Sequence, residues 1–234
     1  MDTMFSRTGE HGNVLFLVLI AVILFAALSY AVVGSTRNQG NNNDGVTTIG
    51  TAELNQYPAS LRLVTMTMRL DGVDVDQFEF NPPSNFATLT SAQVGIFHPQ
   101  GGGASYQNAS PSVMESGAQG QWFFNAEFEI ENLGLSVGAS SQGNELVAFL
   151  PGVKESVCAK VNDRVGLSTA IPDSSADLSA NYRVNMDDAY SLPASETVLG
   201  VAGGNGTDIL SGQPFACFRN NGGEYVYYQV LVER

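Results

Sequence analysis

A run of apolar residues near the start of the chain sets the strongest constraint on its fold. Residues 14–33, "VLFLVLIAVILFAALSYAVV", carry no charged side chain, and only Ser29 and Tyr30 among them are polar. At a rise of about 1.5 Å per residue, a helix of this length is about 30 Å long, which matches the hydrocarbon core of a bilayer. Tyr30 lies near the end of the run, where an aromatic side chain suits the membrane interface. The run therefore predicts a transmembrane helix.

The same run has a second interpretation, a secretion signal that is removed. Cleavable signals have apolar cores of about 7–15 residues and a cleavage site between small side chains. This run is longer, and "VVGST" after it is a poor cleavage site, so a retained anchor is favoured. Charge alone does not determine which end of the predicted helix lies inside the cell, because Arg7 precedes the run and Arg37 follows it. The short N-terminal flank favours an N-terminus inside the cell and the bulk of the chain outside.

Net charge and cysteine usage each restrict what the chain can be. The chain has 10 basic and 23 acidic residues, for a formal net charge of -13. This charge repels phosphate backbones, so nucleic-acid binding is not expected. Cys158 and Cys217 are the two cysteines, and an even count outside the cytoplasm predicts one disulfide. The alternative is two unrelated buried thiols.

Two helices are predicted after the apolar run. A polar stretch, "NQGNNNDG", indicates a flexible break over residues 38–50. Helical spacing of apolar residues follows, but Pro58 is expected to interrupt it, so the predicted helix covers residues 59–70. One face of this segment is apolar: Leu54, Leu61, Val64 and Met68. Valine then recurs every four residues over 153–165, which predicts a second helix that stops at Gly166.

The remaining pattern indicates strands and turns. Short strands are predicted at 76–80 and 91–97, a fully buried strand at 144–150, and a C-terminal hairpin that turns at 221–223. A half-buried antiparallel strand is expected over 121–132, with five positions on its apolar face: Trp122, Phe124, Ala126, Phe128 and Ile130. The aromatic residues of these strands are predicted to pack in the core. The fold class is therefore α+β, with a helix packed on a mainly antiparallel sheet and a C-terminal region closed by the disulfide.

The junction between the polar leader and the apolar run resembles a known signal. The leader ends at Gly12, and the apolar helix begins directly after it. This arrangement is similar to the class III signal of type IV pilins and pseudopilins, in which a membrane peptidase cuts after the glycine and keeps the helix. The chain departs from the family at the fifth position after the cut, where Leu17 stands in place of the usual glutamate.

The resemblance implies a domain organisation and a structural role. Residues 1–12 would be the leader, cut between Gly12 and Asn13, followed by a transmembrane and assembly helix at 13–37, the break at 38–50 and an extracytoplasmic domain at 51–234. Seven residues of the helix are assigned to assembly: Val14, Leu17, Ala21, Leu24, Ala27, Leu28 and Ala31. The resemblance implies a bacterial inner-membrane protein with its bulk periplasmic or extracellular, which forms a surface filament when assembled. Its partners would be copies of itself, the membrane, and pilus or secretion machinery.

Residues that could perform catalysis do not form a recognisable set. His11 and His98 are the two histidines, no G-x-S-x-G accompanies them, and no cysteine–histidine spacing fits zinc. The sequence therefore predicts neither an enzyme nor a cofactor. The acidic loop "DGVDVD" supplies three weak calcium candidates, Asp71, Asp74 and Asp76, for which solvated loop acids are the favoured interpretation.

One alternative function stays open. The chain could instead be a single-pass envelope protein that binds a ligand and never polymerises. Its binding surface would come from the long irregular segments at 98–120 and 173–207.

Overall fold

The computed structural model describes residues 11–37, 42–134, 143–167, 170–193, 197–204 and 206–234, with side chains in the first two helices described for 16–29 and from residue 50 onward. The chain divides into two units, Met1–Gly45 and Val46–Arg234. The first contains helix α1, His11–Arg37, which is 27 residues long. Among the described residues, no helix is long and apolar enough to cross a membrane. The predicted run 14–33 extends beyond the described side chains, so the transmembrane helix stays a prediction.

Helix α2, Asn42–Leu70, is longer than predicted. It begins inside the segment 38–50 expected to be a flexible break, and Pro58 lies within it without ending it. Proline removes one backbone hydrogen bond and costs a helix interior about 3 kcal/mol. Leu54 before the proline and Leu61 after it are both buried against the sheet. Packing on both sides of Pro58 therefore holds α2 continuous.

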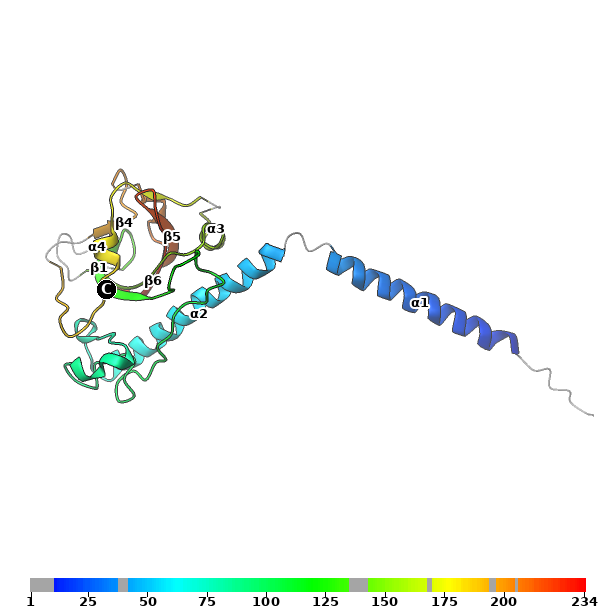
Figure 1. Cartoon of the computed structure of the whole chain (residues 1–234), viewed down its shortest axis with the longest axis horizontal. Helices are drawn as coiled ribbons and strands as arrows, with labels where there is room; N and C mark the ends of the chain where they lie inside the picture. The colour runs from blue at the N-terminus through cyan, green and yellow to red at the C-terminus, as the bar shows by residue number, and fades with distance from the viewer. Residues whose placement is uncertain (1–10, 38–41, 135–142, 168–169, 194–196, 205) are drawn as a thin grey trace, which may run out of the picture. The chain divides into compact units, whose positions relative to one another are not determined.

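Six strands form one mixed sheet in the second unit (Figure 1). Its order is β3-β5-β6-β2-β1-β4. The strands are β1 (Phe123–Ile130), β2 (Glu145–Pro151), β3 (Asp173–Ser174), β4 (Thr197–Leu199), β5 (Phe215–Asn220) and β6 (Tyr225–Val232). The four central strands pair antiparallel, whereas the short edge strands β3 and β4 pair parallel to their neighbours. The prediction of a mainly antiparallel sheet therefore holds for the four central strands, and the two short parallel edge strands make the sheet as a whole mixed.

Helices cover both faces of the sheet. Helix α3, Glu155–Arg164, packs with α2 on one face, and the short α4, Ser179–Tyr182, packs on the other (Figure 1). The first buried cluster includes Leu61 of α2, Val161 of α3 and Tyr227 of β6. The second includes Tyr182 of α4 and Tyr228 of β6, on the opposite face. Consecutive side chains of a strand point to opposite faces of the sheet, so Tyr227 and Tyr228 of β6 belong to different clusters.

Strand β1 changes the face that it presents partway along its length. Its register with β2 shifts between Asn125 and Phe128. Trp122 and Phe124 belong to the first cluster, whereas Phe128 and Ile130 belong to the second. The prediction of one apolar face is therefore wrong from Phe128 onward, because a bulge adds one residue to the strand and reverses the alternation.

The polar positions of β1 are also more buried than predicted. Asn125 and Glu129 are buried, since both faces of the sheet are covered. The side-chain amide of Asn125 donates to the carbonyls of Asn181 and Val184, at 3.2 and 2.9 Å. The predicted half-buried strand is in fact an interior strand, and its buried Asn125 is paired within the protein.

The segments predicted as strands at 76–80 and 91–97 form no ladder. Short 3₁₀ helices, η1 (Val75–Gln77) and η2 (Pro83–Thr88), occupy this region, together with a single bridge between Glu79 and Gly95. Phe78, Glu79 and Phe80 are all buried, so the segment lacks the alternation of buried and exposed positions that the prediction assumed. The Phe80 N–H donates instead to the carbonyl of Met186, at 2.7 Å. The strand prediction fails here because loop contacts satisfy the backbone.

The predicted helix at 153–165 and the predicted hairpin are both confirmed. Helix α3 occupies this segment, and Gly166 follows it with a positive φ of 83°. Strands β5 and β6 form the hairpin, and its turn contains Asn221 and Gly222, both with positive φ. A last 3₁₀ helix, η3 (Asp208–Leu210), buries Leu210 in the second cluster.

Candidate functional site

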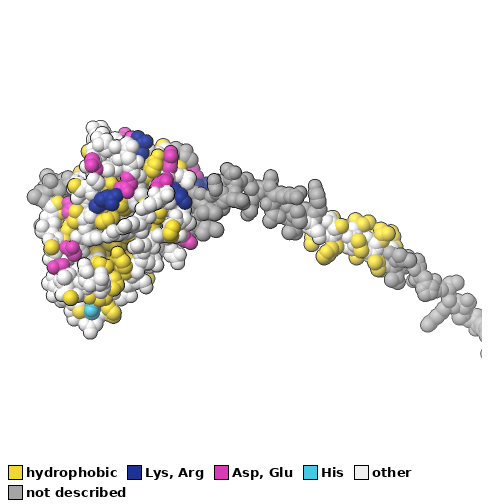
Figure 2. Space-filling model, in the orientation of Figure 1, with side chains coloured by type: hydrophobic (Ala, Val, Ile, Leu, Met, Phe, Trp, Pro, Cys, Tyr) yellow, Lys and Arg dark blue, Asp and Glu magenta, His cyan; other side chains and the backbone are white. Residues whose placement is uncertain are grey.

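Helix α1 exposes an almost continuous apolar surface over its described side chains (Figure 2). Ten large apolar residues are exposed there: Phe16, Leu17, Val18, Leu19, Ile20, Val22, Ile23, Leu24, Phe25 and Leu28. Five of the seven predicted assembly residues lie among the described exposed positions: Leu17, Ala21, Leu24, Ala27 and Leu28. The side chains of Val14 and Ala31 lie outside the described set, although both residues are helical.

The predicted processing site falls at the start of α1. Gly12 and Asn13 follow His11, the first residue of the helix. Their side chains, and the rest of the leader at 1–10, lie outside the described residues. Cleavage between Gly12 and Asn13 therefore stays a prediction.

Helix α2 carries a second exposed apolar surface that sequence reasoning missed. Leu63, Met66 and Leu70, here called the α2 stripe, are 66%, 53% and 89% exposed. They recur at helical spacing, on the side opposite the buried Leu61 and Met68. The sequence contains these three residues as a second set of apolar positions at helical spacing. They were overlooked because the prediction considered only the apolar face that packs on the sheet.

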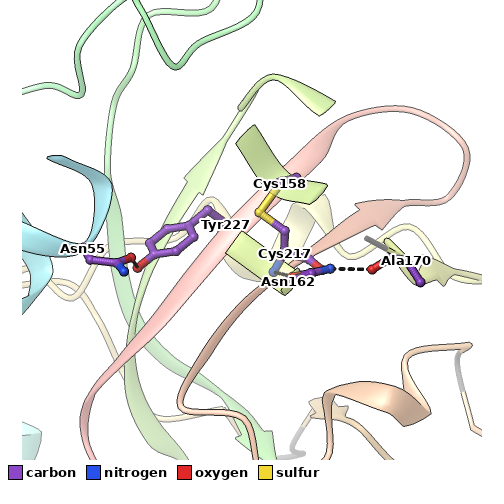
Figure 3. Close-up of a disulfide and its surroundings, with 6 residues drawn as sticks. All are labelled: Asn55, Cys158, Asn162, Ala170, Cys217 and Tyr227. Carbon is purple, nitrogen blue, oxygen red and sulfur yellow. Dashed lines mark hydrogen bonds between the residues drawn. A yellow bond between two sulfur atoms is a disulfide. The ribbon is translucent and has the colours of Figure 1, made fainter. Parts of the chain in front are cut away.

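The predicted disulfide is present and joins α3 to β5. Cys158 and Cys217 are bonded, with Cα atoms 5.3 Å apart, and both are fully buried. Asn162, one helical turn after Cys158, holds the same strand by hydrogen bonds (Figure 3). Its amide donates to the carbonyls of Ala170 and Cys217 at 2.8 and 3.0 Å, and its oxygen accepts the Cys217 N–H at 2.8 Å. Covalent and polar contacts thus fix α3 on β5 together.

Tyr227 joins the sheet to α2 near this disulfide (Figure 3). Its hydroxyl lies 2.8 Å from Oδ1 of Asn55 and 2.6 Å from Oε1 of Gln229. The hydroxyl has one proton, so it donates to one of these two oxygens at a time. Burial raises the pKa of Tyr227 well above its usual range. The tyrosine is therefore a neutral donor that ties α2 to β6.

The calcium candidates are not brought together. Asp71, Asp74 and Asp76 are exposed, and Asp76 forms an ion pair with Arg234. Within the described part of the chain, no three acidic, histidine or cysteine side chains are grouped to hold a metal ion. His98 packs edge-on against Phe86, and its Nδ1 accepts the Gln100 N–H at 3.2 Å.

A cleft of about 640 Å³ lies between α2 and the irregular segment 104–113. Tyr57 and Trp122 lie at its floor, with ring centroids 5.6 Å apart. The first of the two irregular segments proposed as a ligand surface, 98–120, therefore lines a cleft. No residue of the second, 173–207, lines this cleft among the residues that the structure describes. The sequence predicted that Trp122 lies in the core, and it does. It did not predict that α2 and segment 104–113 enclose a cleft next to this residue.

Comparison with known proteins identifies no relative: no family model, no curated protein and no solved structure matches the chain significantly. The architecture, an N-terminal helix followed by a mixed sheet and a C-terminal disulfide, is compatible with that of a pilin.

Proposed function

We propose that the chain is a structural subunit of a pilus-like or pseudopilus-like filament, anchored and assembled through α1. The observation that carries the proposal is the apolar surface of α1 between Phe16 and Leu28. Exposed apolar patches of this kind mark membrane or protein contacts, because water around them is unfavourable. A helix that is apolar on all sides is suited to lipid first and to neighbouring helices afterwards.

Anchoring and assembly would use the same side chains in sequence. In the bacterial inner membrane α1 contacts lipid, with the sheet domain in the periplasm or outside the cell. On assembly, lipid contact is exchanged for the α1 helices of neighbouring copies. Ala21 and Ala27 are small enough to let such helices approach closely. Pilus or secretion machinery would supply the energy that is needed to move α1 out of the membrane.

The α2 stripe supports the same role outside the membrane. Leu63, Met66 and Leu70 lie on the helix that follows α1 in the chain, and they remain exposed in the single subunit. Burying a leucine or methionine side chain contributes about 1.5–3 kcal/mol. Leu17 offers no charge to pair with a neighbouring N-terminus, so apolar packing of α1 and of this stripe would set the register between subunits.

The second candidate function is a non-polymerising, membrane-anchored binding protein. The cleft between α2 and segment 104–113 is the observation that favours it. In that case α1 would serve as an anchor alone.

Processing and assembly can be tested on the native chain. Mass spectrometry of the mature protein is expected to find Asn13 as its first residue. Electron microscopy of material sheared from the envelope is expected to find filaments with α1 in their core. Gly12→Leu is expected to abolish both, whereas Gly9→Leu, a matched change in the same leader, leaves both intact.

Three outcomes would contradict the proposal. A mature chain that begins near residue 35 would lack the assembly helix. Filaments that form equally well with Gly12→Leu would separate assembly from processing. A processed chain that stays monomeric in the envelope would favour the binding protein.

A further inference from the structure

The cleft between α2 and segment 104–113 has two walls from distant parts of the sequence. Glu53, Gln56 and Ser60 line it from one side of α2. Gln107 and Asn108 line it from the irregular segment. Its volume of about 640 Å³ lies in the range of about 300–1,000 Å³ that small-molecule sites occupy.

The irregular wall is fixed at both ends. The Ala104 N–H donates to the carbonyl of Ile96 at 3.0 Å, and the Ala109 N–H donates to the carbonyl of Gly120 at 2.8 Å. Further on, the Lys154 ammonium donates to the carbonyl of Ser112 at 2.7 Å. The side chains of residues 105–108, between the first two attachment points, are exposed. The wall therefore presents polar side chains from a backbone whose ends are held in place.

The floor of the cleft contains two buried hydrogen-bond donors without an acceptor. The Tyr57 hydroxyl and the Trp122 Nε1 donate to no acceptor among the described residues, although the backbone N–H of Gln107 approaches the Tyr57 oxygen. Burial raises the pKa of Tyr57, so its hydroxyl keeps its proton and can donate. Buried polar groups without a partner are rare in proteins, and each requires an explanation. A ligand hydroxyl that reached the floor would supply the missing acceptor.

The charge of the cleft restricts the class of ligand. Among the described residues that line it, Glu53 carries the only charge, so no cation is available to pair with a phosphate or carboxylate. The remaining polar groups are amides and hydroxyls, which both donate and accept. The net charge of -13 adds repulsion against an anionic polymer. These groups suit a neutral ligand that is rich in hydroxyls.

We propose that this cleft binds a neutral carbohydrate chain. Gln56, Gln107 and Asn108 would pair with the sugar hydroxyls, and Glu53 would accept from one of them. Tyr57 and Trp122 would close the cleft beneath the sugar, and a sugar oxygen that reached the floor would accept from their donors. The proposal is independent of assembly, because every residue of the cleft belongs to the second unit.

Trp122 provides a direct signal for the test, since it is the only tryptophan in the chain. The full-length protein in detergent is titrated with maltohexaose, cellohexaose and chitohexaose, with tryptophan fluorescence and calorimetry as readouts. We expect at least one of these neutral probes to give a saturable change in both signals. A sulfated oligosaccharide of the same length is expected to bind at least tenfold more weakly.

Variants locate the site. Gln107→Ala, Asn108→Ala and Tyr57→Phe are each expected to weaken binding about threefold to tenfold, as loss of one hydrogen bond does. Gln119→Ala is the matched control, because Gln119 is an exposed amide that does not line the cleft. Its affinity is expected to equal that of the unaltered chain.

Several results would overturn the proposal. One is no response to any neutral probe up to about 10 mM, tenfold above a Kd of 1 mM. Another is equal affinity in the Gln107→Ala and Gln119→Ala variants, which would place binding elsewhere. Saturable binding of an uncharged serine–asparagine hexapeptide, with no response to the sugars, would assign the cleft to peptides instead.

Discussion

At the scale of single residues, Asn162 is the polar residue on which the region around the disulfide depends. It is fully buried and makes three hydrogen bonds to the backbone of Ala170 and Cys217. Asn162→Ala leaves those backbone groups without partners, and each such loss costs about 1–3 kcal/mol. We therefore expect the free energy of unfolding in urea to fall by at least 3 kcal/mol.

The control for this change lies on the same helix. Asp163 is the next residue of α3 and is exposed. Asp163→Ala is expected to change the free energy of unfolding by about 0.5 kcal/mol or less. Equal losses in the two variants would show that α3 itself, and not the Asn162 contacts, limits stability.

Glu145 makes stability depend on pH. It is fully buried on β2, and burial is the main cause that raises its pKa from 4.5 to about 7. The Ile130 N–H, which donates to its carboxylate at 2.8 Å, lowers this pKa, whereas the nearby Glu129 and Glu233 raise it. Between pH 4.5 and 7 the folded protein therefore holds a proton that the unfolded chain has released. Stability is greatest at the acidic end of this window and falls as the pH rises through it.

The dependence can be isolated with a neutral analogue. From pH 5 to pH 8, we expect the free energy of unfolding to fall by about 2 kcal/mol more in the unaltered chain than in Glu145→Gln. Urea unfolding at the two pH values measures this difference. Glu115→Gln, at an exposed position, is expected to keep the full dependence. An unaltered chain and a Glu145→Gln variant with the same pH dependence would contradict the assignment.

At the scale of elements, the two faces of α2 are expected to behave differently. Leu61 is fully buried, whereas Leu63 is 66% exposed. Leu61→Ala creates a cavity and is expected to reduce the free energy of unfolding by about 2–5 kcal/mol. Leu63→Ala is expected to change it by about 0.5 kcal/mol or less but to reduce the yield of filaments. Thermal unfolding and negative-stain microscopy of the same two variants measure both effects.

Opposite results would reassign the helix faces. A Leu63→Ala variant that is as unstable as Leu61→Ala would mean that the stripe packs within the subunit. If Leu63→Ala forms normal filaments and has normal stability, the α2 stripe is not part of the assembly surface.

Elements with a local signal were predictable, and elements determined by tertiary contacts were not. Helix α3 follows from its valine spacing and from Gly166, and the hairpin follows from its Asn221–Gly222 turn. The bulge of β1 changes no residue type, so the apolar alternation from Trp122 to Ile130 gave no warning of it. Likewise, the destabilising effect of Pro58 on a helix can be predicted from the sequence, but the packing of α2 on the sheet that offsets this effect cannot.

At the scale of the whole molecule, the sequence located the apolar surface but not the cleft. The apolar surface of α1 is a contiguous run, so a one-dimensional pattern contains it completely. The cleft brings α2 together with a segment about 50 residues further along the chain, and only the fold determines that contact. Tyr57 and Trp122 are ordinary core aromatics in the sequence. Their unpartnered donors become visible only when their surroundings are known.

Removal of α1 should separate folding from assembly. Every described residue of the two buried clusters lies at position 54 or later, so both described cores belong to the second unit. A chain that begins at Val46, the start of the second unit, is therefore expected to fold with its disulfide intact and to remain monomeric by light scattering. A full-length chain in which Leu63, Met66 and Leu70 are changed to serine keeps α1 and is expected to stay anchored but to form fewer filaments. Filaments from the truncated chain would transfer the assembly role to the sheet domain, and failure of that chain to fold would show that α1 supports the core after all.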